Sequence, residues 1–129
     1  MTTSEFLGQA FPFHIRLTSS GAVAAVGPSL ARVMPDLHEG SRLDAHFALT
    51  RPYAQPLSME TLEGLQGEVL TLQSTTGLHL QGGVMSHEGS LVLLLVPVVA
   101  DLATLSRMGL TLRDFPPHDV TGDFLLLLQ

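Results

Sequence analysis

The chain has no cysteine, few basic residues and no long apolar segment. The absence of cysteine excludes disulfide bonds, thiolate catalysis and cysteine-ligated zinc sites. Lysine and arginine together number 6 against 12 aspartate and glutamate residues, so the net charge is -6, and the basic residues form no cluster. We therefore expect neither nucleic acid nor an acidic membrane surface as a partner.

Hydrophobic residues are abundant but occur in short runs. The longest runs, Leu91 to Val96 and Phe124 to Leu128, fall far below the roughly 20 residues that a membrane-spanning helix requires. The chain starts without a basic region followed by an apolar one, so we expect no signal peptide and a cytoplasmic location. With 45% hydrophobic and only 14% charged residues, the chain is apolar for a small soluble domain, which predicts that part of its surface contacts a partner.

The length suits a single domain, residues 1–129. Alternating apolar residues predict two strands near its start, at 11–17 and 22–27, joined by a turn at 18–21. In the first strand the odd-numbered apolar residues share one face, and His14 points away from it.

The middle of the chain predicts short helices. Pro28 suits the first turn of a helix that Pro35 must end. Residues 36–56 carry mixed signals, from which we expect short helical turns. Ser58 is predicted to cap a two-turn helix in a segment that ends at Gly67.

Three more strands are predicted in close succession, at 68–73, 78–85 and 90–99, as an antiparallel meander. In the second of them, Gly82 and Gly83 indicate a bulge or close packing. The third does not alternate and is apolar on both faces, so both sides of the sheet must be covered there.

This order of elements predicts an α+β fold of PAS type, with a five-stranded antiparallel sheet and short helices inserted between strands 2 and 3. Flanking helices are expected at both ends of the domain. Residues 1–10 form the N-terminal one, and a further helix starts at Asp101 and stops at Gly109. A proline-stiffened connector then leads to 119–129, the start of a C-terminal helix.

Six stretches of the chain point to a known family: "FPFHIRL", "VGPSLARVMPDL", "SRLDAHFALTRP", "SMETLEGLQGEVLTL", "LHLQGGVM" and "DLATLSRMGLTLRDFPPHDVTGDFLLLLQ". Through these stretches, from about Phe11 to Gln129, the sequence resembles the haem-nitric-oxide-binding-associated domain, a PAS-like module of soluble guanylate cyclases and bacterial signalling histidine kinases. The last of the matching stretches carries most of the weight, because it is long and unusual. Two segments depart from the family pattern. The first hairpin has "TSSGAVAA" where family members often carry charged residues, and Val96-Pro97 stands where a Ser-Pro is usual after the last strand. Both departures discourage the transfer of detailed surface contacts from the family to this chain.

The resemblance implies a signalling module that has no catalytic activity and binds no cofactor. Such a module dimerises with a second copy or a homologous subunit. It relays a signal from a haem nitric-oxide-binding sensor domain to a histidine kinase or nucleotide cyclase, through a coiled coil that follows it. The alternative is a PAS-type sensor domain that binds a small ligand or haem itself.

As an interaction module, the domain needs an apolar sheet face and terminal helices that bury against a second copy. Phe6 and Leu7, the apolar last strand and the terminal leucines supply such residues. The candidate dimer interface is Phe6, Leu7, Phe13, Val92, Leu94, Val96, Leu125 and Leu128.

His118 and Asp119 could form a general base with its orienting carboxylate, but no third catalytic group accompanies them. We favour a structural interpretation in which Asp119 caps the terminal helix, with Thr121 nearby, and His118 bonds within the connector.

The other five histidines lack the spacing of a metal site. Among them, His46 is the candidate axial ligand for haem, although we favour a histidine on the polar side of a short helix. By alternation, His14 and His79 are expected on the surface or at an interface.

Overall fold

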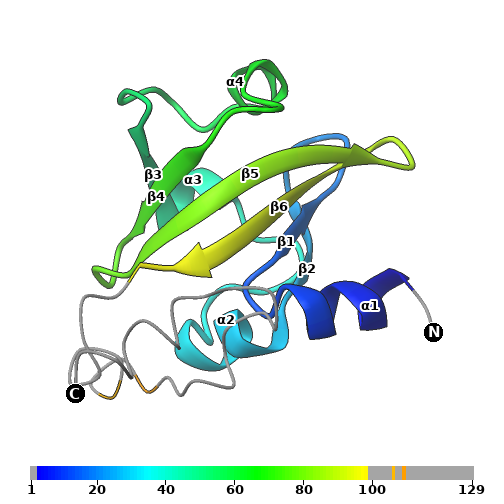
Figure 1. Ribbon diagram of the computed structural model, residues 1–129, viewed down its shortest axis with the longest axis vertical. Coiled ribbons are helices and arrows are strands. Elements are labelled where there is room, and N and C mark those ends of the chain that lie inside the picture. Colours follow the sequence, from blue (N-terminus) through cyan, green and yellow to red (C-terminus); the bar gives the residue numbers. More distant parts are fainter. Residues whose placement is uncertain (1–2, 99–105, 107–108, 110–129) are drawn as a thin grey trace, which may run out of the picture.

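The computed structural model describes residues 3–98, 106 and 109. Within them, a six-stranded antiparallel sheet has the strand order β2-β1-β6-β5-β4-β3 (Figure 1). The strands are β1 (Ile15–Leu17), β2 (Val23–Val26), β3 (Phe47–Arg51), β4 (Leu70–Ser74), β5 (His79–His87) and β6 (Ser90–Pro97). The helices are α1 (Thr3–Ala10), α2 (Pro28–Val33), α3 (Leu43–His46) and α4 (Met59–Gly64). None of these helices has the length and apolar character needed to cross a membrane.

The α+β class and the antiparallel meander are confirmed, but the predicted number of five strands is wrong. The sixth strand, β3, lies in the segment 36–56, for which only helical turns were predicted. It pairs with β4 at the edge of the sheet, with Phe47 opposite Ser74 and Leu49 opposite Leu72. Phe47 and Leu49 are buried and Ala48 between them is exposed, which is the alternation of a half-buried strand.

The first predicted strand is shorter than expected. Only Ile15–Leu17 pairs with β2 and β6, because residues 11–14 instead connect α1 to the sheet. In this connection the carbonyl oxygen of Pro12 accepts bonds from the backbone N–H groups of Ser29 and Leu30, at 3.1 and 3.3 Å. These bonds tie the start of α2 to the chain that enters β1.

The helices α2 and α4 begin where the sequence signals predicted. Pro28 is the first residue of α2, as expected for a residue without a backbone N–H. Ser58 caps α4, and its Oγ accepts a hydrogen bond from the N–H of Thr61 at 3.1 Å. Gly67, with φ of 85°, lies in the turn that leads from α4 to β4.

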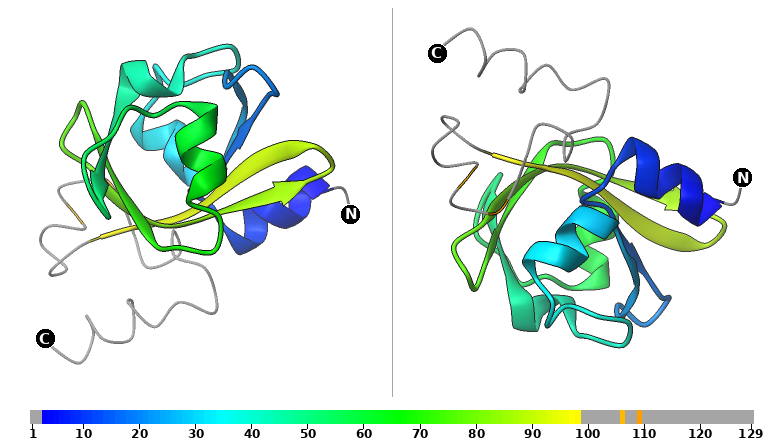
Figure 2. Two further views of the ribbon diagram at one scale, coloured as in Figure 1. Left: turned by 90° about the horizontal axis from the view of Figure 1, so that it is seen from above. Right: turned by 90° about the horizontal axis from the view of Figure 1, so that it is seen from below.

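The core lies between the sheet and the helical middle. Figure 2 shows α4 on one side of the β5–β6 ribbon and α1 on the other. We call the face toward α4 the inner face and the face toward α1 the outer face. The fully buried large side chains are Phe13, Ile15, Leu17, Val23, Leu30, Leu62, Leu70, Leu72, Leu80, Leu93 and Leu95.

The last strand is covered on both faces at one point only. Leu93 and Leu95 are fully buried on the inner face. On the outer face Val92 is buried, whereas Leu94 and Val96 remain partly exposed. The expected double coverage therefore holds near α1 and ends toward the other end of the strand.

Gly82 marks close packing and not a bulge. The register of β5 with β6 runs without a shift from Leu80 opposite Pro97 to His87 opposite Ser90. A Cβ atom on Gly82 would overlap the backbone carbonyl oxygen of Leu94, so the two strands approach each other too closely there for any larger residue.

Little of the chain after β6 belongs to the described part. Gly109 has φ of 74° and its N–H donates to the carbonyl oxygen of Ser106 at 3.0 Å. The Nη2 of Arg32 in turn donates to the carbonyl oxygen of Gly109 at 3.3 Å, which places this residue beside α2. The rest of the helix predicted from Asp101, and the helix predicted at 119–129, lie outside the described residues.

Candidate interaction surface

The outer face of the sheet carries a largely apolar surface, in which Glu68 and Gln81 are the polar side chains of the larger hollow described below. Alternation along the paired strands β5 and β6 puts every second residue of each strand on this face. The paired residues there are Gln81 and Val96, Gly83 and Leu94, and Met85 and Val92. Neither β5 nor β6 contains Asp, Glu, Lys or Arg. We call this surface the outer patch, and define it as Phe6, Leu7, Phe11, Val69, Met85, Val92, Leu94 and Val96.

Two hollows make up the outer patch. One, of about 280 Å³, lies between α1 and the β5–β6 ribbon, with Phe6, Leu7 and Val92 among its lining residues. The other, of about 640 Å³, extends along the sheet past Gly83 to Val69. Both are lined by Phe11, Met85 and Leu94, so the two hollows form one surface.

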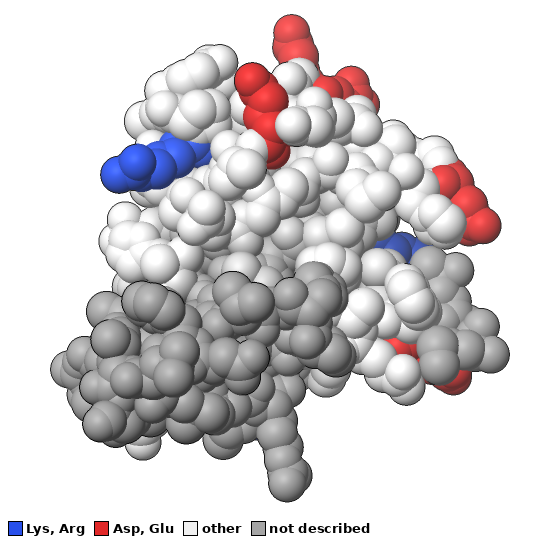
Figure 3. Space-filling view, viewed as in Figure 1, with Lys and Arg blue, Asp and Glu red and all other residues white. Residues whose placement is uncertain are grey.

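Large apolar side chains of the outer patch are open to solvent. The exposed fraction is 59% for Phe6, 54% for Met85 and 63% for Val69. Figure 3 shows the charged atoms mainly near α4 and along the edges of the view, and the surface over β5 is largely uncharged. A contiguous apolar surface of this kind is typical of a protein-protein contact.

The structure brings most of the described candidate interface residues together. Phe6 and Leu7 on α1 lie beside Val92 and Leu94 on β6 in the smaller hollow. Val96 lines the larger one. Leu125 and Leu128 lie outside the described residues.

Phe13 is a correction to the candidate interface. Its side chain is fully buried in the core, because it shares the inward-facing side of the chain with Ile15 at the start of β1. A residue that already packs inside one domain has no surface to offer to a second copy.

Sequence reasoning missed Phe11, Met85 and Val69. Phe11 was predicted to share one strand face with Ile15 and Leu17 because the first strand was expected to start there, whereas it lines both hollows of the outer patch. Met85 lies on the outer face because the odd-numbered residues of β5, among them His79 and Gln81, share that face. This alternation could have been recognised in the sequence.

His14 is buried, contrary to the surface or interface position that was predicted, and its side chain is 3% exposed. Its Nδ1 lies 2.9 Å from the carbonyl oxygen of Phe11 and donates to it, which fixes the tautomer. Burial lowers the pKa of His14 below the ordinary value of 6.5. The hydrogen bond to Phe11 opposes this shift, and the nearby charge of Arg16 adds to it.

His79 is exposed, as expected.

His46, the candidate haem ligand, is half-buried at the end of α3. Its carbonyl oxygen accepts a hydrogen bond from the N–H of Thr75 at 3.0 Å. It lines neither hollow of the outer patch. Across the described residues, no group of three or more histidines and carboxylates is placed to hold a metal ion. His118, Asp119 and Thr121 lie outside the described part of the chain.

Comparison with known proteins gives matches along the whole chain. A family model described as "Heme NO binding associated" matches residues 1–81 and 66–129. The chain is also similar to guanylate cyclase soluble subunit beta-2 of Homo sapiens, with 28% identity over 133 residues. This alignment covers 93% of the chain but only 22% of the human protein.

Proposed function

Because the chain belongs to the Heme NO binding associated family, we propose that it is a non-catalytic signalling module that dimerises. In this role it relays a signal from a haem nitric-oxide-binding sensor domain to an effector, either a nucleotide cyclase or a histidine kinase. The family description supports the sensor, and the similarity to a guanylate cyclase subunit supports the cyclase.

The outer patch is the observation that supports dimerisation. Exposed Phe6 and Met85 line its two hollows together with partly exposed Leu94 and Val96, and burial of such side chains against an identical surface removes them from water. A two-fold dimer uses the same patch on both copies, so one surface satisfies both partners. The partner is a second copy or a homologous subunit.

A PAS-like arrangement fits the sheet once β3 is set aside. The other five strands then have the order β2-β1-β6-β5-β4, and all three helices α2, α3 and α4 fall between β2 and β4 in the sequence. In this proposal β3 is an addition at the sheet edge, where it leaves the outer patch unchanged.

Two connections provide a route for the signal. Residues 11–14 link α1 to β1 and lie against the start of α2 through the bonds to Pro12. Arg32 of α2 contacts Gly109 in the chain that follows the sheet. A shift of α1 on dimerisation or sensor contact is thereby communicated to the C-terminal side. There we propose that His118, Asp119 and Thr121 form the connector and helix cap. We also propose that residues 119–129 start the coiled coil, and that Leu125 and Leu128 belong to the dimer interface.

Sedimentation equilibrium of the chain and of Leu94→Glu tests the dimer. The new carboxylate would be buried without a partner in the contact, so we expect the dimer dissociation constant to rise by about 30-fold or more. Circular dichroism of the variant should stay that of the folded domain, because Leu94 is only partly buried in the monomer.

The matched control is Ala45→Glu, which adds the same charge at an exposed position of α3 on the helical side of the sheet. It should leave the dissociation constant unchanged. A wild-type chain that is monomeric at high concentration, or an equal effect of both substitutions, would rule out the outer patch as the dimer interface.

A further inference from the structure

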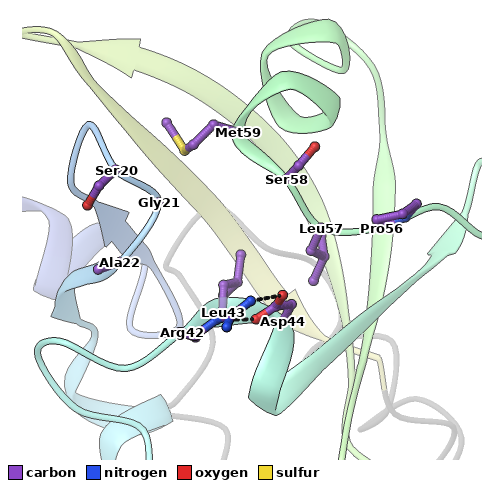
Figure 4. Close-up of a pocket in the computed structure, with 10 residues that line it drawn as sticks. All are labelled: Ser20, Gly21, Ala22, Arg42, Leu43, Asp44, Pro56, Leu57, Ser58 and Met59. Atoms are coloured by element: carbon purple, nitrogen blue, oxygen red, sulfur yellow. Dashed lines mark hydrogen bonds and ion pairs between the residues drawn. The ribbon is translucent and has the colours of Figure 1, made fainter.

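A third hollow lies away from the outer patch, between the β1–β2 turn, α3 and the chain that leads into α4 (Figure 4). We call it the hairpin pocket. Its volume is about 580 Å³, within the range of roughly 300–1,000 Å³ in which small molecules bind. None of its lining residues belongs to the outer patch, so a role for it is independent of the proposed dimer.

The walls of the hairpin pocket are mostly apolar. Leu43 is buried at its base, and Leu57 and Met59 are half-buried on one side. Gly21 faces them from the turn between β1 and β2, where its φ is 89°. A Cβ on Gly21 would come within 3.2 Å of the Cγ of Met59, so the missing side chain helps to keep the pocket open.

One polar pair lines the pocket. The Nε and Nη2 of Arg42 donate to the two carboxylate oxygens of Asp44 at 3.1 and 2.8 Å. Within the described residues, Nη1 of Arg42 makes no hydrogen bond, and each oxygen of Asp44 can accept one more. The pair is neutral as a whole, and its side chains are 79% and 45% exposed, so it offers a donor beside an acceptor at the solvent side of the pocket.

We propose that the hairpin pocket binds a small apolar molecule that carries an amide group. The amide oxygen accepts from Nη1 of Arg42, the amide N–H donates to Asp44, and the apolar body lies against Leu43, Leu57 and Met59. A carboxylate ligand has no donor for Asp44, and an ammonium ligand has no acceptor for Arg42, so each satisfies only one member of the pair.

Methionine methyl groups labelled with ¹³C provide a direct reading of binding. The chain has 5 methionines, of which Met59 lines the hairpin pocket and Met85 lies in the outer patch. On titration with N-benzylacetamide, the Met59 signal should shift with a saturating curve and a dissociation constant of about 1 mM, typical of a fragment of this size. The Met85 signal should not move.

Two paired variants and two paired probes make the test specific. Ser20 lines the pocket from the exposed turn and Ser19 beside it does not, so Ser20→Phe should abolish the Met59 shift and Ser19→Phe should preserve it. Phenylacetate and benzylamine should bind at least about 10-fold more weakly than the amide. The unchanged signal of Met34 in the core reports that each variant is folded.

Three results would overturn the proposal. In the first, the wild-type chain shows no saturating Met59 shift. In the second, Ser20→Phe leaves the shift intact, so the amide binds elsewhere. In the third, phenylacetate or benzylamine binds as tightly as the amide, which means that the Arg42–Asp44 pair does not select the ligand. The Leu94→Glu sedimentation result is unaffected by all three.

Discussion

Two adjacent glycines in β5 have opposite structural roles. A Cβ on Gly82 would overlap the carbonyl oxygen of Leu94, whereas the nearest atom to a Cβ on Gly83 is the carbonyl oxygen of Glu68 at 3.9 Å. The first glycine allows the two central strands to approach each other, and the second leaves the outer patch open. The sequence indicated a bulge or close packing at this pair, but only the positions of the neighbouring backbone atoms show which residue requires glycine.

We therefore expect Gly82→Ala to lower the free energy of unfolding by more than about 2 kcal/mol. The added methyl group must push β5 away from β6, and these are the most extensively paired strands of the sheet. Urea denaturation of both variants measures the difference. Gly83→Ala is the matched control and should be neutral or stabilising by up to about 1 kcal/mol, and equal losses in the two variants would contradict this interpretation.

At the level of elements, the sequence predicted those that local signals define. Ser58 and Pro28 marked the starts of α4 and α2 correctly, because a cap and a first-turn proline act within one helical turn. β3 was missed, because its stability comes from pairing with residues of β4 that lie 20 to 27 positions later, and no local signal separates it from the prolines and short turns around it. The surface position of His14 was also wrong, since residues 11–14 form a connection and not a strand.

The α1–β1 connection should respond to pH through His14. Its pKa is lowered in the folded chain, so the unfolded chain binds more protons between the folded value and the ordinary 6.5. The stability contributed by the neutral, buried imidazole is present above pH 6.5 and is lost as the pH falls from there through the folded pKa.

His14→Asn keeps a side-chain N–H near the carbonyl oxygen of Phe11 and removes the titration. The free energy of unfolding, measured from urea curves between pH 7.5 and about 5, should fall less steeply with decreasing pH in the variant than in the wild-type chain. Identical slopes would show that His14 is not a source of the acid sensitivity.

For the whole molecule, the apolar composition by itself predicts a contact surface, and the fold shows where that surface lies. Phe6, Leu7, Val92, Leu94 and Val96 were selected from the sequence as separate apolar residues. The antiparallel register and the position of α1 bring them together with Phe11 and Met85. Phe13 could have been separated from them, because alternation puts it on the same face as Ile15 and Leu17, and all three are buried.

Protection of a single thiol tests the proposed outer-patch dimer most directly. The chain has no cysteine, so Met85→Cys and Tyr53→Cys each carry one reactive group, and the replaced side chains are similarly exposed, at 54% and 56%. As the protein concentration passes through the range in which the chain dimerises, we expect the labelling rate of the thiol at position 85 to fall and that at position 53 to stay constant. A constant rate at position 85 during dimerisation would contradict the outer patch as the interface, and so would an equal fall at both positions.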